Sequence, residues 1–242
     1  MVYSLLAASF LIGFVLFGVG TGGLGSISDL FGGGGSGSTS SAYDSQINHA
    51  KAVLKKDPQN QQALQNLARY ELLAGQTGVT QSSDPTQPPT VSDDAATNFS
   101  AAADAWTRYL KVAKKPDPTI ASQMAQVYFQ FLNDPNGAIR AQRIFADAQP
   151  SANTIGQLAI YEYAAGNQKA GDATAKAAVA KAPASSRKQI KSQLDQISKQ
   201  AAKFFAAQKA AAKASGGSQG AGASQLQNPF SGLSPSGTPT TP

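Results

Sequence analysis

Few side chains in this sequence have the type and spacing that chemistry at a site requires. There is no cysteine, and the one histidine is His49. These counts exclude a thiolate nucleophile and a disulfide framework, and they leave too few ligands for a catalytic zinc site. The sequence also lacks a phosphate-binding loop motif, an H-E-x-x-H motif and a G-x-S-x-G motif. We therefore expect no metal, no cofactor and no enzymatic activity.

The carboxylates and aromatic residues that remain are better explained by structure. Asp93 and Asp94 follow Ser92 at an expected helix start, where the helix dipole favours negative charge. Glu71 and Glu162 stand at equivalent places in two similar segments, which favours a structural role over catalysis. Trp106 and the tyrosines recur at helical spacing, which is typical of a core rather than a cofactor site.

The elements that position these residues are expected to be helices, so the predicted fold is all-α. Alanine is abundant, and no segment shows sustained strand alternation. Asp117-Pro118 and Asp134-Pro135 each place a capping carboxylate before a proline at the first helical position. The expected helices cover residues 43–56, 60–74, 93–114, 118–132, 135–148, 152–165, 168–181 and 185–213.

Two stretches align without a gap, which indicates an internal repeat. Residues 64–75 and 155–166 both read apolar, x, x, Leu-Ala, x, Tyr-Glu, x, x, Ala-Gly, and residues 121–128 form a looser third copy. Fixed-period similarity of this kind is typical of solenoids.

The spacing of the copies fits helical hairpins with one insertion. Leu67, Met124 and Leu158 align at intervals of 57 and 34 residues, and 34 is the period of the tetratricopeptide repeat. Most of the excess in the longer interval is the polar, proline-rich stretch at 76–92, which predicts a loop. The remainder would lengthen the helix that follows.

These copies resemble the tetratricopeptide repeat (TPR) family. A small alanine follows a large apolar residue in each first helix, as Leu67-Ala68, Met124-Ala125 and Leu158-Ala159. A glycine closes the first helix at Gly75 and Gly166, and a proline ends the second helix near Pro58 and Pro183. The chain departs from the family at its first-helix tryptophan, where Leu64, Ala121 and Ile155 stand. Tyr128 alone keeps the family's tyrosine in register.

The resemblance implies an α-solenoid of about three hairpins over residues 43–183, preceded by a half-repeat. It also implies a groove, lined by the first helix of each hairpin, that binds an extended peptide or a helix of another protein. The residues that the family pattern places in this groove are Gln62, Gln65, Arg69, Thr119, Ser122, Gln126, Phe129, Asn153 and Tyr163. They depart from the Lys and Asn pattern of carboxylate-clamping members, so a carboxylate-clamp role is not expected.

The last expected helix, residues 184–214, is basic and amphipathic. Its apolar seam is Ile190, Leu194, Ile197, Ala201 and Phe204, and its other faces hold Arg187, Lys188, Lys191, Lys199 and Lys203. A helix that caps the solenoid is the expected role. A helix that docks a partner and a helix that lies on anionic lipid remain alternatives. Nucleic-acid binding is not expected, because exposed aromatics do not interleave with the basic residues.

The amino-terminal segment predicts a membrane anchor. No charged side chain precedes Asp29, and residues 1–24 are long and apolar enough to cross about 30 Å of hydrocarbon as a helix. A cleaved signal peptide is the alternative, although no basic residue precedes Lys51 and no A-x-A site stands out. A basic start upstream of this sequence is a third explanation. The free amino terminus favours a folded body outside the cytoplasm.

The segments combine into one expectation. A Gly/Ser-rich linker at 25–42 joins the anchor at 2–24 to the repeats, and residues 215–242 form a polar tail that is expected to be disordered. This order resembles bacterial single-pass membrane proteins that contain TPRs, and it implies a scaffold that binds another protein near the cell membrane. The alternative is a structural envelope protein whose basic terminal helix binds anionic lipid or polymer.

Overall fold

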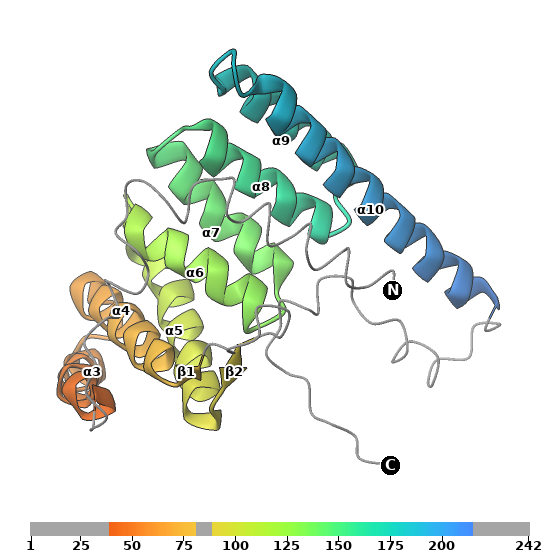
Figure 1. The fold of residues 1–242 in the computed structure, drawn as a ribbon. Coiled ribbons are helices and arrows are strands. Elements are labelled where there is room, and N and C mark those ends of the chain that lie inside the picture. Colours follow the sequence, from red (N-terminus) through yellow and green to blue (C-terminus); the bar gives the residue numbers. More distant parts are fainter. Residues whose placement is uncertain (1–38, 81–88, 215–242) are drawn as a thin grey trace.

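Helices make up most of the chain that the computed structural model describes, residues 39–80 and 89–214 (Figure 1). They are α3 (Thr39–Lys56), α4 (Gln61–Thr77), α5 (Asp93–Val112), α6 (Pro118–Gln130), α7 (Pro135–Ala148), α8 (Ala152–Ala164), α9 (Gln168–Lys181) and α10 (Arg187–Ala214). The expected all-α fold is confirmed. The predicted anchor at 1–24, most of the predicted linker and the predicted tail at 215–242 lie outside the described residues.

The helices pair as hairpins that follow one another along the chain. α4 packs on α5, α6 on α7, and α8 on α9, while α3 packs on the outer side of α4 (Figure 1). α10 packs on α9 and α8, so it covers the end of the stack. Within residues 39–80 and 89–214 the arrangement is solenoid-like, with three hairpins, one preceding helix and one terminal helix.

Side-chain caps explain where several helices begin. Asp117 Oδ1 accepts hydrogen bonds from the backbone N–H groups of Thr119 and Ile120, and Asp134 Oδ1 accepts one from Gly137. Both aspartates precede a proline at the first position of the helix. The two caps predicted from the sequence are therefore confirmed.

The insertion changes the first hairpin. α4 and α5 have 17 and 20 residues, whereas α6 and α8 have 13 each and α7 and α9 have 14 each. Two short strands, β1 (Val79–Thr80) and β2 (Thr90–Val91), pair antiparallel across the insertion. The sequence does not predict these strands, because two residues are too few to show alternation.

The two aligned glycines, Gly75 and Gly166, have different structural roles. Gly166 has a φ of +76° and ends the first helix of the third hairpin, as expected. Gly75 lies inside α4, which continues to Thr77, so the prediction that it closes this helix is wrong. A Cβ on Gly75 would lie 2.6 Å from the Phe99 ring of the longer α5. Gly75 is therefore needed for close packing between the two helices.

Glu71, Tyr128 and Glu162 occupy the same position of the three repeat copies, and each contacts the helix that precedes its hairpin. Glu71 on α4 pairs with Lys51 on α3 at 2.8 Å, and Glu162 on α8 pairs with Arg143 on α7 at 3.1 Å. In the second hairpin this position is Tyr128, whose hydroxyl contacts α5. The buried glutamates thus have structural partners, in agreement with their expected role.

Aromatic side chains fill the junction between the first two hairpins. Phe99 on α5 and Phe131, just after α6, stack with ring centroids 4.5 Å apart and planes 7° apart. Trp106 is 1% exposed and packs beside Tyr109 on α5. The prediction that Trp106 is a core residue is confirmed.

Candidate functional site

The first helices of the three hairpins, α4, α6 and α8, carry amide side chains on their accessible surface. α6 contains no charged residue, the one charged residue of α8 is the buried Glu162, and the one exposed charge of α4 is Arg69. We name the exposed and half-buried amides of these helices the amide face: Gln61, Gln62, Gln65, Asn66, Gln76, Gln123, Gln126, Gln130, Asn153 and Gln157.

The second helices, α5, α7 and α9, carry the exposed charges instead. Their exposed ionisable residues are Asp93, Asp94, Asp104, Arg108, Lys111, Arg140, Arg143, Asp147, Lys169, Asp172, Lys176 and Lys181. Exposed charge is thus concentrated on the second helix of each hairpin, where the amides Asn98, Asn136 and Gln168 also lie, and the first helices keep a largely uncharged polar surface.

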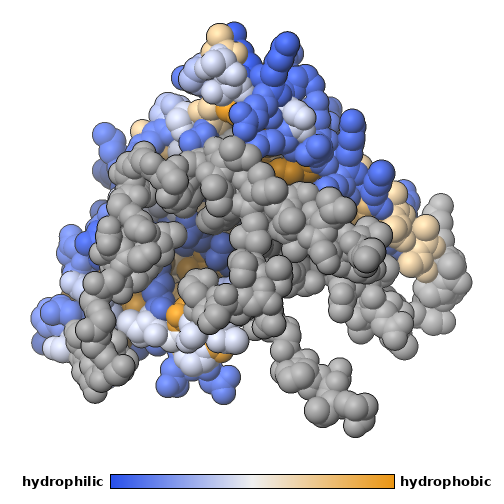
Figure 2. Space-filling view, viewed as in Figure 1, coloured by the Kyte–Doolittle hydropathy of each residue, from blue (hydrophilic) through white to orange (hydrophobic). Residues whose placement is uncertain are grey.

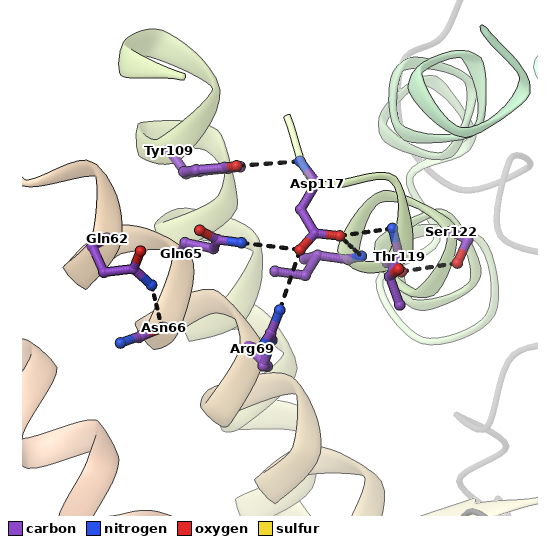
Figure 3. A network of polar contacts seen from close by, with 9 residues as sticks. Gln62, Gln65, Asn66, Arg69, Tyr109, Asp117, Thr119 and Ser122 are labelled. Carbon is purple, nitrogen blue, oxygen red and sulfur yellow. Dashed lines mark hydrogen bonds and ion pairs between the residues drawn. The ribbon is translucent and has the colours of Figure 1, made fainter. Parts of the chain in front are cut away.

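Asp117 joins the amide face of α4 to the start of α6 (Figure 3). Its Oδ2 accepts hydrogen bonds from Gln65 Nε2 at 2.9 Å and from Arg69 Nη2 at 3.2 Å, while Oδ1 caps α6. The Asp117 side chain is 20% exposed and that of Arg69 is 44% exposed. One carboxylate therefore links two hairpins, and it pairs with Arg69, the one exposed charge of α4.

Tyr109 on α5 holds the backbone of the same residue, Asp117. Its hydroxyl accepts a hydrogen bond from the backbone N–H of Asp117 at 3.2 Å. Burial raises the pKa of the Tyr109 phenol, so the neutral hydroxyl is the form that the folded chain favours.

Most of the predicted groove residues lie at or near the surface. Gln62, Arg69, Thr119 and Asn153 are exposed, and Gln65, Ser122 and Gln126 are half-buried. The structure brings Gln65 and Arg69 together at Asp117, and Ser122 donates a hydrogen bond to the Thr119 carbonyl (Figure 3). Gln62 donates to Asn66 on the same helix.

The prediction that Tyr163 and Phe129 line an open groove is wrong. Tyr163 is 1% exposed, because its ring packs on Gly171 of α9 and its hydroxyl donates to Asp172 Oδ1 at 2.9 Å. Phe129 is 8% exposed, and its ring packs on Tyr161 with centroids 4.8 Å apart. Both side chains belong to the core between helices, so neither offers an open surface.

The sequence does not predict that Asp117 links α4 to the start of α6. The Asp-Pro pair signals the cap of α6, but one of its oxygens also binds Gln65 and Arg69, which are 52 and 48 residues away. No local pattern carries that information.

Residues suited to catalysis do not gather within the described part of the chain. That part has no group of three or more His, Cys, Asp or Glu side chains that could hold a metal ion. His49 is exposed on α3, and Asp93 and Asp94 occupy the first turn of α5, where the helix dipole accounts for them.

A shallow apolar hollow lies among α7, α8 and α9. It is lined by Ala146, Asp147, Pro150, Ile155, Leu158, Ala173, Thr174 and Ala177. These side chains offer few polar groups, so the hollow lacks the convergent donors and acceptors that fix a small ligand.

The terminal helix α10 buries the centre of its apolar seam, leaves Ile190, Ile197 and Phe204 half-buried, and exposes its basic residues. Leu194 and Ala201 are 1% exposed, whereas Lys199 and Lys203 are exposed. Arg187 Nε donates to the Ala182 carbonyl at the end of α9. The remaining basic residues predicted for this helix, Lys188 and Lys191, are exposed as well.

No helix within residues 39–80 or 89–214 has the length and apolarity to span a bilayer. No protein-family description, curated protein or solved structure matches the chain.

Proposed function

We propose that this chain is a non-enzymatic, membrane-anchored scaffold of the TPR type, whose amide face docks another protein. The observation that carries the proposal is that exposed charges are concentrated on the second helix of each hairpin, which leaves mostly uncharged polar side chains on the first helix. Exposed and half-buried amides occupy α4, α6 and α8, whose one exposed charge is Arg69, while twelve exposed charges occupy α5, α7 and α9.

The chemistry of the amide face suits a polypeptide partner. Each Asn or Gln side chain offers two N–H donors and one carbonyl acceptor, the same groups that a peptide backbone presents. An uncharged polar surface gives little long-range attraction, so it favours partners recognised by short-range hydrogen bonds. The partner we propose is an extended peptide or a helix with few charges on its contacting side.

The Asp117 link supports this role. Because Asp117 holds Arg69 and Gln65, the α4 part of the amide face is positioned before a partner arrives. A surface that is ordered in advance loses less conformational entropy on binding. The repeated contact at Glu71, Tyr128 and Glu162 also supports the TPR assignment, since it places one register position at each junction.

The membrane part of the proposal rests on the sequence. Residues 2–24 provide the anchor, and the body lies outside the cytoplasm of a bacterial-type cell. Such an arrangement confines the amide face to the neighbourhood of the membrane, where a scaffold would gather its partner.

Matched amide-to-carboxylate changes test the proposal. The variant of the amide face, called the groove variant, combines Gln126→Glu and Asn153→Asp. The control variant combines Asn136→Asp on α7 with Gln46→Glu on α3, and these two control positions are exposed. Each tagged chain is recovered from solubilised membranes, and bound proteins are quantified by mass spectrometry. We expect a stoichiometric partner with wild type and control that the groove variant loses. Equal recovery by all three chains would contradict docking at the amide face.

A further inference from the structure

Positive charge gathers on the last two helices. α9 and α10 hold ten Lys and Arg residues against Asp172 and Asp195, a formal net charge of +8. The rest of the described chain balances, with ten basic and ten acidic residues. Figure 2 shows strongly hydrophilic residues along this α9–α10 edge, before the alanine-rich end of α10.

Both carboxylates of this region already have partners. Asp172 Oδ1 accepts hydrogen bonds from Tyr163 and from Ser198, and Asp195 pairs with Lys191. The other lysines are therefore not neutralised by these two carboxylates.

The basic residues of α10 lie on one side of its buried seam. Successive residues of a helix are rotated by about 100°, which places its Lys and Arg side chains from Arg187 to Lys209 within about half a turn on one side of Leu194. The opposite side holds glutamines: Gln189, Gln193, Gln196, Gln200 and Gln208. The helix thus has an apolar seam, a basic side and an uncharged side.

α9 extends the basic side of α10 into a wider surface. Gln168 and Asp172 of α9 both contact Ser198, so the two helices meet along the basic side of α10. Lys169 and Lys199 follow the contacting residues directly, and both are exposed. We call the exposed lysines here the cationic face: Lys169, Lys176, Lys188, Lys199 and Lys203.

We propose that the cationic face docks on an anionic membrane surface. A helix of 28 residues is about 42 Å long, so the charge is spread over an extended area rather than gathered in a pocket. A lipid surface matches such an area, and it attracts each nearby lysine with an energy equivalent to about fivefold in affinity. Single-strand binding needs aromatic side chains for stacking, and the cationic face has none.

This inference goes beyond the proposed function, because it uses α9 and α10 and leaves the amide face free for a protein. A docked cationic face would also fix the orientation of the body relative to the membrane.

Lipid quenching of a fluorophore on the full chain tests the docking. The chain has no cysteine, so Ala206→Cys places one dye on the basic side of α10, and Gln59→Cys places a control dye between α3 and α4. Each labelled chain is reconstituted in vesicles that contain spin-labelled lipid. One set is neutral phosphatidylcholine, and the other includes about 30% phosphatidylglycerol as the anionic lipid.

We expect the dye at position 206 to be quenched at least twofold more in anionic vesicles at about 0.05 M salt, and to lose this difference at about 0.5 M. Replacing Lys169, Lys176, Lys199 and Lys203 with Gln lowers the docking equilibrium by about two to three orders of magnitude. The matched control replaces four exposed lysines elsewhere, Lys55, Lys56, Lys111 and Lys114, and keeps the quenching.

Equal quenching on neutral and anionic vesicles would overturn the proposal, as would an equal effect of the two lysine variants. Displacement of the face from vesicles by a DNA duplex at equal phosphate concentration would assign it to nucleic acid instead. Retention of the chain on neutral vesicles reports the anchor, and partner recovery reports the amide face. Failure of docking is therefore distinct from failure of the proposed function.

Discussion

Replacing Asp117 should separate the cap of α6 from the link between the first two hairpins. Asp117→Ala removes both, whereas Asp117→Asn keeps a side-chain oxygen that can cap the helix but removes the charge that binds Arg69. Asp117→Ala therefore loses both the cap and the link to Arg69, whereas Asp117→Asn loses the charged link and keeps the cap.

The expected magnitudes follow from the contacts. Loss of a cap costs about 1 kcal/mol. The Gln65 hydrogen bond contributes about 1 kcal/mol. The Arg69 ion pair, whose arginine is 44% exposed, contributes only about 0.5 kcal/mol after screening by solvent. We expect Asp117→Ala to lower the free energy of unfolding by about 2–3 kcal/mol and Asp117→Asn by about 1 kcal/mol.

Urea denaturation followed by circular dichroism measures both values. A double-mutant cycle with Arg69→Met isolates the ion pair, and we expect a coupling energy of about 0.5 kcal/mol. In thermal melts the Ala variant should lose roughly 4–12 °C.

Two results would refute this reasoning. Equal destabilisation by Ala and Asn would mean that the cap contributes nothing. A coupling energy near zero, together with an unchanged effect of Asp117→Ala in a Gln65→Ala background, would mean that the link between hairpins contributes nothing.

Four further predictions concern packing, backbone strain, pH and membrane attachment. Gly75→Ala should destabilise the fold by about 1–3 kcal/mol through its clash with Phe99, and Phe99→Leu should relieve part of that cost in a denaturation cycle; additive effects would exclude the clash. Gly166→Ala should cost about 1 kcal/mol because of its positive φ, with Gly166→Asn costing less, and equal costs would argue against backbone strain. Burial raises the pKa of Tyr161 and Tyr163 above 10.0, so their stabilising effect is complete below about pH 10 and declines as the pH rises through the folded pKa. Denaturation at about pH 8 and pH 11, with tyrosinate absorbance as the second readout, checks this; unchanged stability would contradict it. Fractionation should leave the chain in the membrane after a carbonate wash, with its body cut by protease added from outside the cytoplasm; release by the wash would contradict the anchor.

The sequence contains most of the information for the fold. Helix positions follow from caps such as Asp117 and Asp134, and the order of hairpins follows from the spacing of Leu67, Met124 and Leu158. These signals are local or periodic, so they can be read from one chain.

The candidate site is less predictable, because its details depend on contacts between distant helices. The family pattern places Tyr163 in a groove, but α9 presents Gly171 and Asp172 to it, and Ser198 of α10 binds that same aspartate. Gly75 aligns with Gly166, but the longer α5 brings Phe99 against it and α4 continues. In each case a neighbouring element, rather than the residue's own segment, decides the outcome.

Site-specific photo-crosslinking in cells tests the central claim most directly. A photoreactive residue replaces Gln62 or Gln126 on the amide face, or Asn136 or Lys176 on the second helices, all at exposed or half-buried positions. We predict that both amide-face positions crosslink to one and the same protein in the membrane fraction and that the second-helix positions do not. Crosslinks to that protein from the second helices alone, or none from either amide-face position, would contradict a scaffold that docks its partner on α4, α6 and α8.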